Sequence, residues 1–522
     1  MESKSNSAVK AAGLMMAITL IGKVLGLVRE MFLASSFSIS EEANAFVAAS
    51  QIPRVFFDIV FASAISASFI PVFNEYMKKR GKKEAFLLSS NFITLVGILS
   101  MAITVLGIVF APYLSVLFAD GFDQQTIDLC TRLLRILFPT TIFTGIAFSF
   151  VGVLQSMDEF NIPAAMSIVS NLIIIIYFIF FNDRFGVYGL TVAFLIGWAM
   201  QAVIQIPSLL KKGYKYRFYL NIKDSGIKKI IILMLPVMVG TWVQPVNLAV
   251  NTKFASKLFE GSGVSAVNYA NTVYSIIIGV FVLSIANVIF PRLSRMSVDK
   301  DHENFSRTIS STLEAMAFLI IPMTLGLMVL SEPVIRLIYQ RGNFSNFAVD
   351  ITAKALFYFS IGMPGFGIHN ILSRAFYARQ NGRIPLISGL VSIAVNIVLC
   401  NLLIGKLDIG GLALASAVSQ TVAAAILFIP MQKENRIVDK FLINEVIKMV
   451  LASVIMALSA VLARNAALSY LSGGFVSNVI VTAVSAMAGI VVYALVSYIL
   501  KVNAMKLSLD IIFKTLKRSD NP

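Results

Sequence analysis

The stretch GKVLGLVREMFLASSF, residues 22–37, is apolar enough to enter a lipid bilayer and yet contains Lys23, Arg29 and Glu30. A charge near the bilayer centre costs at least roughly 2.5–3.5 kcal/mol on insertion scales, so it normally faces a cavity or another helix rather than lipid. The stretch therefore predicts a membrane helix whose charged side chains point into the protein.

The composition of the whole chain agrees with a membrane location. Of 522 residues, 57% are hydrophobic and 13% are charged, whereas about 25% are charged in an ordinary soluble domain. Two cysteines, Cys130 and Cys400, and two histidines are too few for a metal cluster or a disulfide framework. We expect an all-α polytopic membrane protein without a cofactor, whose first apolar segment is a retained helix rather than a signal peptide.

Apolar runs near the roughly 20 residues that a bilayer requires predict fourteen transmembrane helices. Their expected ranges are 8–36, 43–76, 84–117, 127–155, 160–182, 186–210, 227–258, 264–292, 308–339, 346–378, 384–404, 409–431, 441–463 and 474–500.

The distribution of Lys and Arg predicts the orientation, because positively charged loops stay in the cytoplasm. The two ends of the chain and every second loop hold 28 basic residues, whereas the seven loops between them hold five. Both termini are therefore expected in the cytoplasm. This bias explains most of the net charge of +16 and makes a nucleic-acid partner unnecessary. The basic tail 506–518 fits a lipid-bound amphipathic helix or, as we favour, a simple cytoplasmic anchor.

An internal repeat is visible in the positions of prolines and glycines. Matching residues recur in order at shifts of 220 to 222, and corresponding positions are six helices apart, so the two copies share one orientation in the membrane. We expect two six-helix lobes, 1–222 and 223–440, related by a parallel pseudo-twofold axis, followed by two helices and a tail, 441–522. A substrate site is expected between the lobes. The matched pairs are Pro71 with Pro291, Pro163 with Pro385, and Gly189 with Gly411.

Basic residues inside the expected helices are candidates for substrate binding. They exceed the two deep acids, Glu30 and Asp58, by about three charges, and an excess of buried positive charge requires an anion. Arg is well suited to bidentate phosphate contacts, so a phosphate-bearing substrate would satisfy the site. The alternative is a pair of structural ion pairs, Arg29 with Glu30 and Arg54 with Asp58. The basic residues are Lys23, Arg29, Arg54, Lys253 and Arg374.

Four strings of this sequence are similar to a known family. RLIYQRGNFSNFAVDITAKAL (336–356), GMPGFGIHNILSRAFYARQNGRIPLI (362–387), SASFIPVFNEY (66–76) and GKVLGLVRE (22–30) resemble the MurJ (MviN) lipid II flippases of the MOP exporter superfamily. The resemblance implies a two-lobed fold in the bacterial cytoplasmic (inner) membrane. It implies transport of a polyprenyl pyrophosphate-linked peptidoglycan precursor by alternating access, a tail groove formed by the last two helices, and other cell-wall synthesis proteins as partners.

The residues that the family uses in its cavity are only partly present. Arg29 matches the second of two family arginines in the first helix, but Lys23 stands at the first. Asn44 stands where the family usually has an aspartate, and Thr272 where it has an arginine. The family's arginine and glutamate of the second helix align with Phe57 and Ala62, so Arg54, Asp58 and Lys253 are candidate replacements. A relative that moves another polyprenyl-linked oligosaccharide is therefore an alternative.

Energy coupling and two rival functions can also be weighed from the sequence. The interiors of the expected helices 7, 11 and 12 lack Asp and Glu, so Asn251, Asn396 and Ser416 are only weak ligands for a cation, and membrane potential is the simpler driving force. A cation-coupled drug exporter would need buried acids rather than buried bases. A membrane enzyme would need catalytic spacing among the acids of the outer loops, and none is recognisable. We therefore expect a transporter rather than an enzyme.

Overall fold

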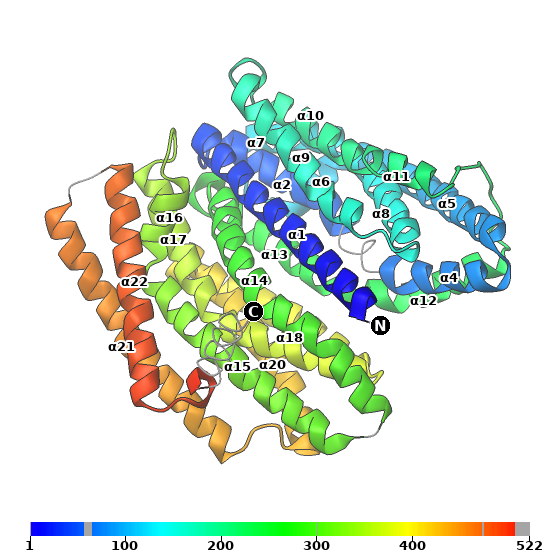
Figure 1. Cartoon of the computed structure of the whole chain (residues 1–522). Helices are drawn as coiled ribbons and strands as arrows, with labels where there is room; N and C mark the ends of the chain where they lie inside the picture. Colours follow the sequence, from blue (N-terminus) through cyan, green and yellow to red (C-terminus); the bar gives the residue numbers. More distant parts are fainter. Residues whose placement is uncertain (1, 57–64, 300, 472–473, 507–522) are drawn as a thin grey trace. The chain divides into compact units, whose positions relative to one another are not determined.

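The computed structural model describes residues 2–56, 65–299, 301–471 and 474–506, so Asp58, Phe57, Ala62 and the basic tail lie outside the described residues. Within these ranges all regular structure is helical. This is expected of a chain in lipid, because a helix satisfies its backbone hydrogen bonds within one segment. The chain divides into two compact units, Met1–Ser265 and Ala266–Pro522, and Figure 1 traces the helices of each.

The first unit contains thirteen described helices and the start of α14. They are α1 (Glu2–Phe37), α2 (Glu41–Phe56), the π-helix η1 (Ile65–Phe69), α4 (Ile70–Lys79), α5 (Lys82–Val109), α6 (Ala111–Phe118), α7 (Gln124–Leu137), α8 (Thr140–Ser156), α9 (Asn161–Phe180), α10 (Asn182–Val203), α11 (Ile206–Lys211), α12 (Ser225–Thr241) and α13 (Val243–Ala255). A short 3-10 turn, η2 (Phe259–Gly261), precedes α14.

The second unit contains the rest of α14 and eight further helices. They are α14 (Gly263–Val298), α15 (His302–Val329), α16 (Ser331–Tyr339), α17 (Asn346–Ile361), α18 (Met363–Ala378), α19 (Arg383–Leu407), α20 (Ile409–Asn435), α21 (Lys440–Tyr470) and α22 (Phe475–Ile499). Helix starts follow the sequence, since the carboxylates of Asp301 and Asp439 and the hydroxyl of Ser345 accept backbone hydrogen bonds at the N-termini of α15, α21 and α17.

Ten helical segments in the described residues are long and apolar enough to cross a membrane, or eleven if the bent pair α17–α18 is one span. These correspond to eleven of the fourteen predicted ranges. The other three are not among these segments: 8–36 lies within α1, 43–76 includes residues outside the description, and 227–258 is divided at Trp242 into two shorter helices. The chain is thus a multi-span helical protein.

Helix α5 shows how the sequence suits a lipid environment. In the second half of α5 the buried face carries polar side chains: Ser100 donates to the Val96 carbonyl at 2.6 Å, and Thr104 bonds to the Thr141 hydroxyl at 2.8 Å. Its exposed face is apolar, and Met101 is 53% exposed. This is the reverse of a soluble amphipathic helix and places the apolar face against lipid.

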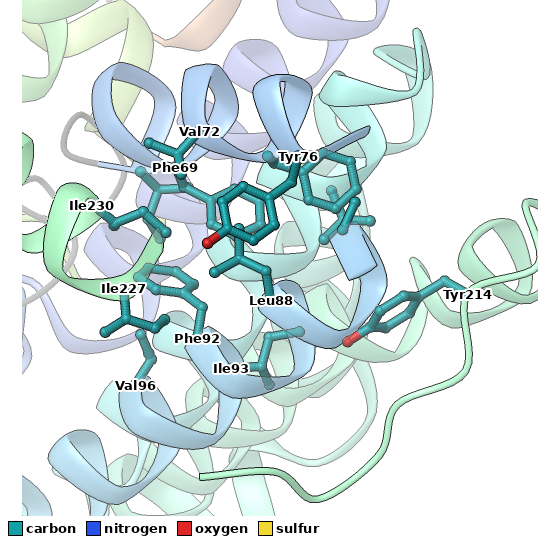
Figure 2. Packing of buried hydrophobic residues seen from close by; sticks show 14 of the residues in the cluster. Phe69, Val72, Tyr76, Leu88, Phe92, Ile93, Val96, Tyr214, Ile227 and Ile230 are labelled. Atoms are coloured by element: carbon teal, nitrogen blue, oxygen red, sulfur yellow. The ribbon is translucent and has the colours of Figure 1, made fainter. Parts of the chain in front are cut away.

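An apolar cluster anchors the end of the first unit at which α4, α5 and α12 meet (Figure 2). Phe69 and Phe92 lie with ring centroids 4.9 Å apart, and Ile227 and Ile230 of α12 complete the cluster. Tyr76 at its edge directs its hydroxyl to the Asp224 carboxylate, which caps α12. The contacts fix α12 beside the helices that precede it by about 150 residues.

Helices α17 and α18 meet at a bend of 45°, although the sequence predicts one continuous span over 346–378. Pro364 lies in the first turn of α18, where its missing N–H is tolerated, and Gly362 separates the helices. A Cβ at Gly362 would lie 2.8 Å from the Ala417 Cα, so the glycine lets this bend approach α20 closely.

Left-handed backbone positions recur at a nearly constant interval. Positive φ is uncommon for residues other than glycine, so coincidences among such positions are informative. Four of them have a counterpart 222 or 223 residues later, and each lies at or near the end of a helix. They are Ser38 with Glu260, Asp158 with Gln380, Gly186 with Asp408, and Gly213 with Arg436.

Candidate functional site

Arg29 lies where α1 packs against α9 and α10 in the first unit. Its Nη2 donates to the Glu30 carboxylate at 2.5 Å, and its Nη1 donates to Asn171 Oδ1 at 3.0 Å. The guanidinium carbon also lies 5.2 Å from the centre of the Phe194 ring. The ion pair weighed from the sequence is therefore present, and it is largely buried, with the side chain of Arg29 18% exposed and that of Glu30 9%.

Asn171 is a functional candidate that the sequence analysis missed. It lies within the apolar helix α9, and its Nδ2 donates to the Gly22 carbonyl at 3.1 Å while its Oδ1 accepts from Arg29. One amide thus joins the carbonyl before Lys23 to the Arg29 guanidinium. An amide at the start of the run NLIIIIYF, halfway along the predicted span 160–182, is the signal that could have identified it.

Lys23 is half-buried and forms no hydrogen bond or ion pair with the described part of the chain. It lies one residue from the Gly22 carbonyl that Asn171 holds. Arg54, in the last described turn of α2, is exposed. Its expected partner Asp58 is outside the described residues, so the pair Arg54–Asp58 stays a prediction.

Lys253 lies at a helix end and not deep in a helix, which corrects the sequence analysis. It is in the last turn of α13, and its Nζ lies 3.5 Å from the Asp120 carboxylate, which also pairs with Lys257 at 3.2 Å. The prediction was wrong because α13 ends at Ala255 and because an acid from the turn after α6 supplies the partner. Lys253 therefore does not count among the basic residues that lack an acidic partner deep in the helices.

Asn44 is buried and its side chain is fully engaged. Its Nδ2 donates to the carbonyls of Ile39 and Ser40 at 2.8 and 2.7 Å, and its Oδ1 accepts from the backbone N–H of Ser265 at 2.8 Å. These bonds tie the start of α2 to the first turn of α14. The position at which the family usually has an aspartate therefore serves here to hold two helix ends together.

Two of the predicted site residues lie in the second unit. Thr272 of α14 is half-buried and donates to the carbonyl of Asn268 at 2.9 Å. Arg374 of α18 is half-buried, with its guanidinium carbon 5.6 Å from the centre of the Phe290 ring. Both lie on helix faces within the bundle.

The weak cation candidates are only partly brought together. Ser416 donates to Asn396 Oδ1 at 3.4 Å between α20 and α19, whereas Asn251 belongs to α13 of the other unit. Within the described residues, no group of three or more His, Cys, Asp or Glu side chains is arranged to hold a metal ion.

An apolar groove of about 530 Å³ lies beside the C-terminal helical hairpin. We call it the hairpin groove; it is bounded by α14, α15, α16, α21 and α22 and lined by, among others, Phe281, Pro322, Met456, Gly489 and Tyr493. The hairpin is fixed at both ends.

At one end of the hairpin, Arg464 and Arg336 share the Glu332 carboxylate at 2.6 and 2.9 Å. At the other end, Asn503 joins the buried carboxylates of Glu445 and Glu314 at 2.7 and 2.9 Å. Glu314 and Glu445 are buried acids that the sequence did not single out. Their positions near the ends of predicted spans concealed them.

A bundle of apolar spans with half-buried charges and a lateral apolar groove is the architecture of a polytopic membrane transporter for an amphiphilic substrate. Comparisons with known proteins specify the family. The family model described as lipid II flippase MurJ matches residues 33–500. The chain therefore belongs to the MurJ lipid II flippase family, which confirms the resemblance predicted from the sequence.

Individual relatives agree along most of the chain. A probable lipid II flippase MurJ of Treponema pallidum is 29% identical over 448 residues, covering 83% of this chain and 84% of that protein. A lipid II flippase MurJ of Burkholderia cenocepacia is 27% identical, with 80% and 82% covered. A solved structure of a lipid II flippase MurJ in an inward closed conformation has a TM-score of 0.78 and 26% identity and covers 93% of this chain.

A multidrug-resistance MATE transporter of the MOP superfamily in an inward-facing conformation has a TM-score of 0.69 at 15% identity and covers 81% of this chain. At this identity the likeness concerns the fold alone.

Proposed function

We propose that this protein moves lipid II, a polyprenyl pyrophosphate-linked peptidoglycan precursor, from the cytoplasmic to the outer leaflet by alternating access. The supporting observation is the family match over residues 33–500, which extends over most of both compact units and over the C-terminal hairpin. The protein is accordingly a transporter and not an enzyme. Its expected setting is the bacterial inner membrane, with both termini in the cytoplasm and other cell-wall synthesis proteins as partners.

The proposed architecture has fourteen membrane helices in two lobes, 1–222 and 223–440, with 441–522 added at the end. The paired left-handed positions support a parallel repeat, because helix ends recur 222 or 223 residues apart. By this assignment α12 and α13 belong to the second repeat, although their packing is within the first compact unit. Such a repeat suits alternating access.

The residues proposed to contact the pyrophosphate are Lys23, Arg29, Arg54, Thr272 and Arg374. Arg29 is the strongest member, since Glu30 and Asn171 orient its guanidinium and its side chain is still 18% exposed. Glu30 acts by orienting Arg29, and Asn44 acts by holding two helix ends together. Lys23→Arg is expected to preserve transport, because it keeps the charge and adds a planar fork.

The hairpin groove is the proposed path of the polyprenyl tail. A leucine at Gly489, which lines the groove, would occupy space that the tail needs. Gly489→Leu should therefore weaken binding of lipid II while leaving binding of a soluble nucleotide sugar with the same pyrophosphate unchanged. Gly405→Leu is the matched control, because a Cβ at Gly405 of α19 would have no neighbour within 4 Å.

A binding and flipping assay in proteoliposomes tests the proposed function. We expect lipid II to bind more tightly than its sugar lacking phosphate, binding to weaken with salt, and labelled lipid II to reach the opposite leaflet only when the protein is present. Binding of a lipophilic cation that pyrophosphate lipids fail to displace would refute the flippase proposal in favour of a drug exporter.

A further inference from the structure

An irregular segment between α11 and α12, residues 213–224, is held firmly along α5 in the first unit. We call it the strap. Tyr214 and Tyr216 bond through their hydroxyls to Ser90 at 3.2 Å and to Thr94 at 2.9 Å. Asn221 exchanges two hydrogen bonds of 2.9 Å with the Asn91 side chain. These hydrogen bonds fix the strap in one position along α5.

The strap nevertheless exposes large apolar side chains, which alternate in sequence with polar and basic ones. Four apolar residues are about half to three-quarters exposed, whereas a surface in water normally avoids such a cluster. Lys215, Arg217 and Lys223 lie between or beside them and are also exposed. This mixture is typical of the membrane–water interface, where aromatic rings sit at headgroup level and bases meet phosphates. The apolar residues are Tyr216 at 48%, Phe218 at 75%, Leu220 at 45% and Ile222 at 62% exposure.

Two of these aromatic residues cover one end of a groove between α5 and α8. The groove has a volume of about 970 Å³, at the upper end of the roughly 300–1,000 Å³ typical of ligand sites. Its walls are almost entirely apolar. They include Ile98, Met101, Val105, Ile142, Ile146 and Phe150, with Tyr216 and Phe218 at the end beside the strap.

The depth of the strap fits the headgroup region. The strap contacts Ser90 to Thr94, which lie 8 to 12 residues after the first residue of α5, or about 12–18 Å along its axis. The 28 residues of α5 span about 42 Å, longer than a hydrocarbon core of about 30 Å. The first turns of α5 therefore project beyond the hydrocarbon, and the groove runs from the strap into the hydrocarbon.

Positive charge gathers at the same end of the unit. The turn between α4 and α5 meets the strap, since Lys82 Nζ lies 3.5 Å from where a Cβ of Gly213 would be. Residues 75–84 and 211–229 together contain twelve Lys and Arg and only three acids. Of those acids, Glu75 is paired with Lys79 and Lys229, and Asp224 caps α12. The surplus favours an anionic headgroup.

We propose that the groove between α5 and α8 binds an anionic phospholipid, with an acyl chain between the two helices and the phosphate beside Arg217 and Lys215. The phospholipid enters sideways from the leaflet that this end of the protein faces. The site is separate from the hairpin groove and does not depend on the identity of the transported substrate.

A space-filling substitution tests the acyl part of the site. Gly97 lines the groove, and a Cβ there would meet nothing within 4 Å, so Gly97→Leu fills the groove without a clash. We expect purified Gly97→Leu to retain less phosphatidylglycerol than the unaltered protein when bound lipid is quantified by mass spectrometry. Gly405→Leu, equally free of neighbours, should retain the normal amount. Equal retention by all three proteins would overturn the proposal.

A fluorescence measurement tests the headgroup part. The chain has only two tryptophans, Trp198 and Trp242, which can be changed to Phe so that Phe218→Trp becomes the reporter. In nanodiscs, brominated phosphatidylglycerol should quench this reporter at lower mole fraction than brominated phosphatidylcholine. Each of Lys215→Gln and Arg217→Gln should reduce the preference about fivefold.

Phe180→Trp, at the end of α9 and also largely exposed, is the control and should show no preference. A Phe218→Trp reporter quenched equally by both lipids would refute an anionic site. If the protein prefers phosphatidylglycerol but does not flip lipid II, the proposed function is refuted and the phospholipid site is not. The two failures are therefore distinguishable.

Discussion

Replacing Arg29 separates a structural role from a role in substrate binding. In Arg29→Ala, the Glu30 side chain, only 9% exposed, loses the guanidinium that lies 2.5 Å away, and Asn171 loses a donor at 3.0 Å. In Arg29→Ala/Glu30→Ala the two charges disappear together. The two variants share the loss of Arg29 and differ in whether the acid is left behind.

The expected magnitudes follow from the burial of the pair. Removing one partner of a buried ion pair costs about 3–5 kcal/mol, and the partial exposure of Arg29 places this case near 3 kcal/mol. The double variant should lose only about 1 kcal/mol, the value of one hydrogen bond to Asn171, because no buried carboxylate remains without its cation. Urea titrations of the two variants and of the unaltered protein, in the same detergent micelles, measure both changes in the free energy of unfolding.

Transport provides the second readout. If Arg29 binds pyrophosphate, both variants should fail to flip lipid II in proteoliposomes, including the double variant whose stability is nearly restored. Asn171→Ala tests the positioning contact by itself, since it keeps both charges and removes only the hydrogen bond that orients Arg29, and it should reduce flipping less than loss of Arg29 does. Normal flipping by Arg29→Ala/Glu30→Ala would refute a substrate-binding role and leave the ion pair as a purely structural feature.

Three further predictions concern other parts of the chain. Single cysteines at Lys82 and Gln124 should react with impermeant thiol reagents from opposite sides of the membrane, and labelling of both from one side would exclude the proposed topology. Asn44→Ala should lower the free energy of unfolding by about 2–3 kcal/mol, because three hydrogen bonds of a buried amide are lost. A decrease below about 0.5 kcal/mol, which is less than one hydrogen bond contributes, would contradict this role. Hydrogen bonds from the side chain and backbone N–H of Asn304 hold the pKa of Asp301 below its usual value. The cap on α15 should therefore stabilise the helix fully above about pH 4 and be lost as the pH falls further. Hydrogen exchange of the first turn of α15 can test this. Asp301→Asn should abolish that pH dependence.

Periodicity and length were sufficient to find most of the fold, because lipid enforces long apolar helices. They failed where a helix is broken within a span. Trp242 divides the range 227–258, and Gly362 bends the range 346–378 by 45°. The signal at the second break, Pro364 beside Gly362, was present in the sequence but was outweighed by the length of the apolar run.

The candidate site was harder to predict because pairing depends on neighbours that are remote in sequence. The contact of Arg29 with Glu30 could be anticipated from adjacency, but its contact with Asn171 spans 142 residues. Lys253 looked deep because its helix was expected to end later, and Asp120, its partner, stood in a loop assigned to no role. Charge counting within helices cannot recognise an acid supplied by a turn.

The seating of α1 on α9 determines how Arg29 can move (Figure 1). A Cβ at Gly22 would lie 2.3 Å from Ser167 Oγ, Asn171 reaches the Gly22 carbonyl, and the rings of Phe32 and Phe178 stack at 5.8 Å further along. Because of these contacts, neither helix can slide along the other without first moving apart from it. A rearrangement that moves Arg29 along the membrane normal must therefore move α9 as well. The charge is carried by a rigid pair of helices and not by the bending of α1 alone.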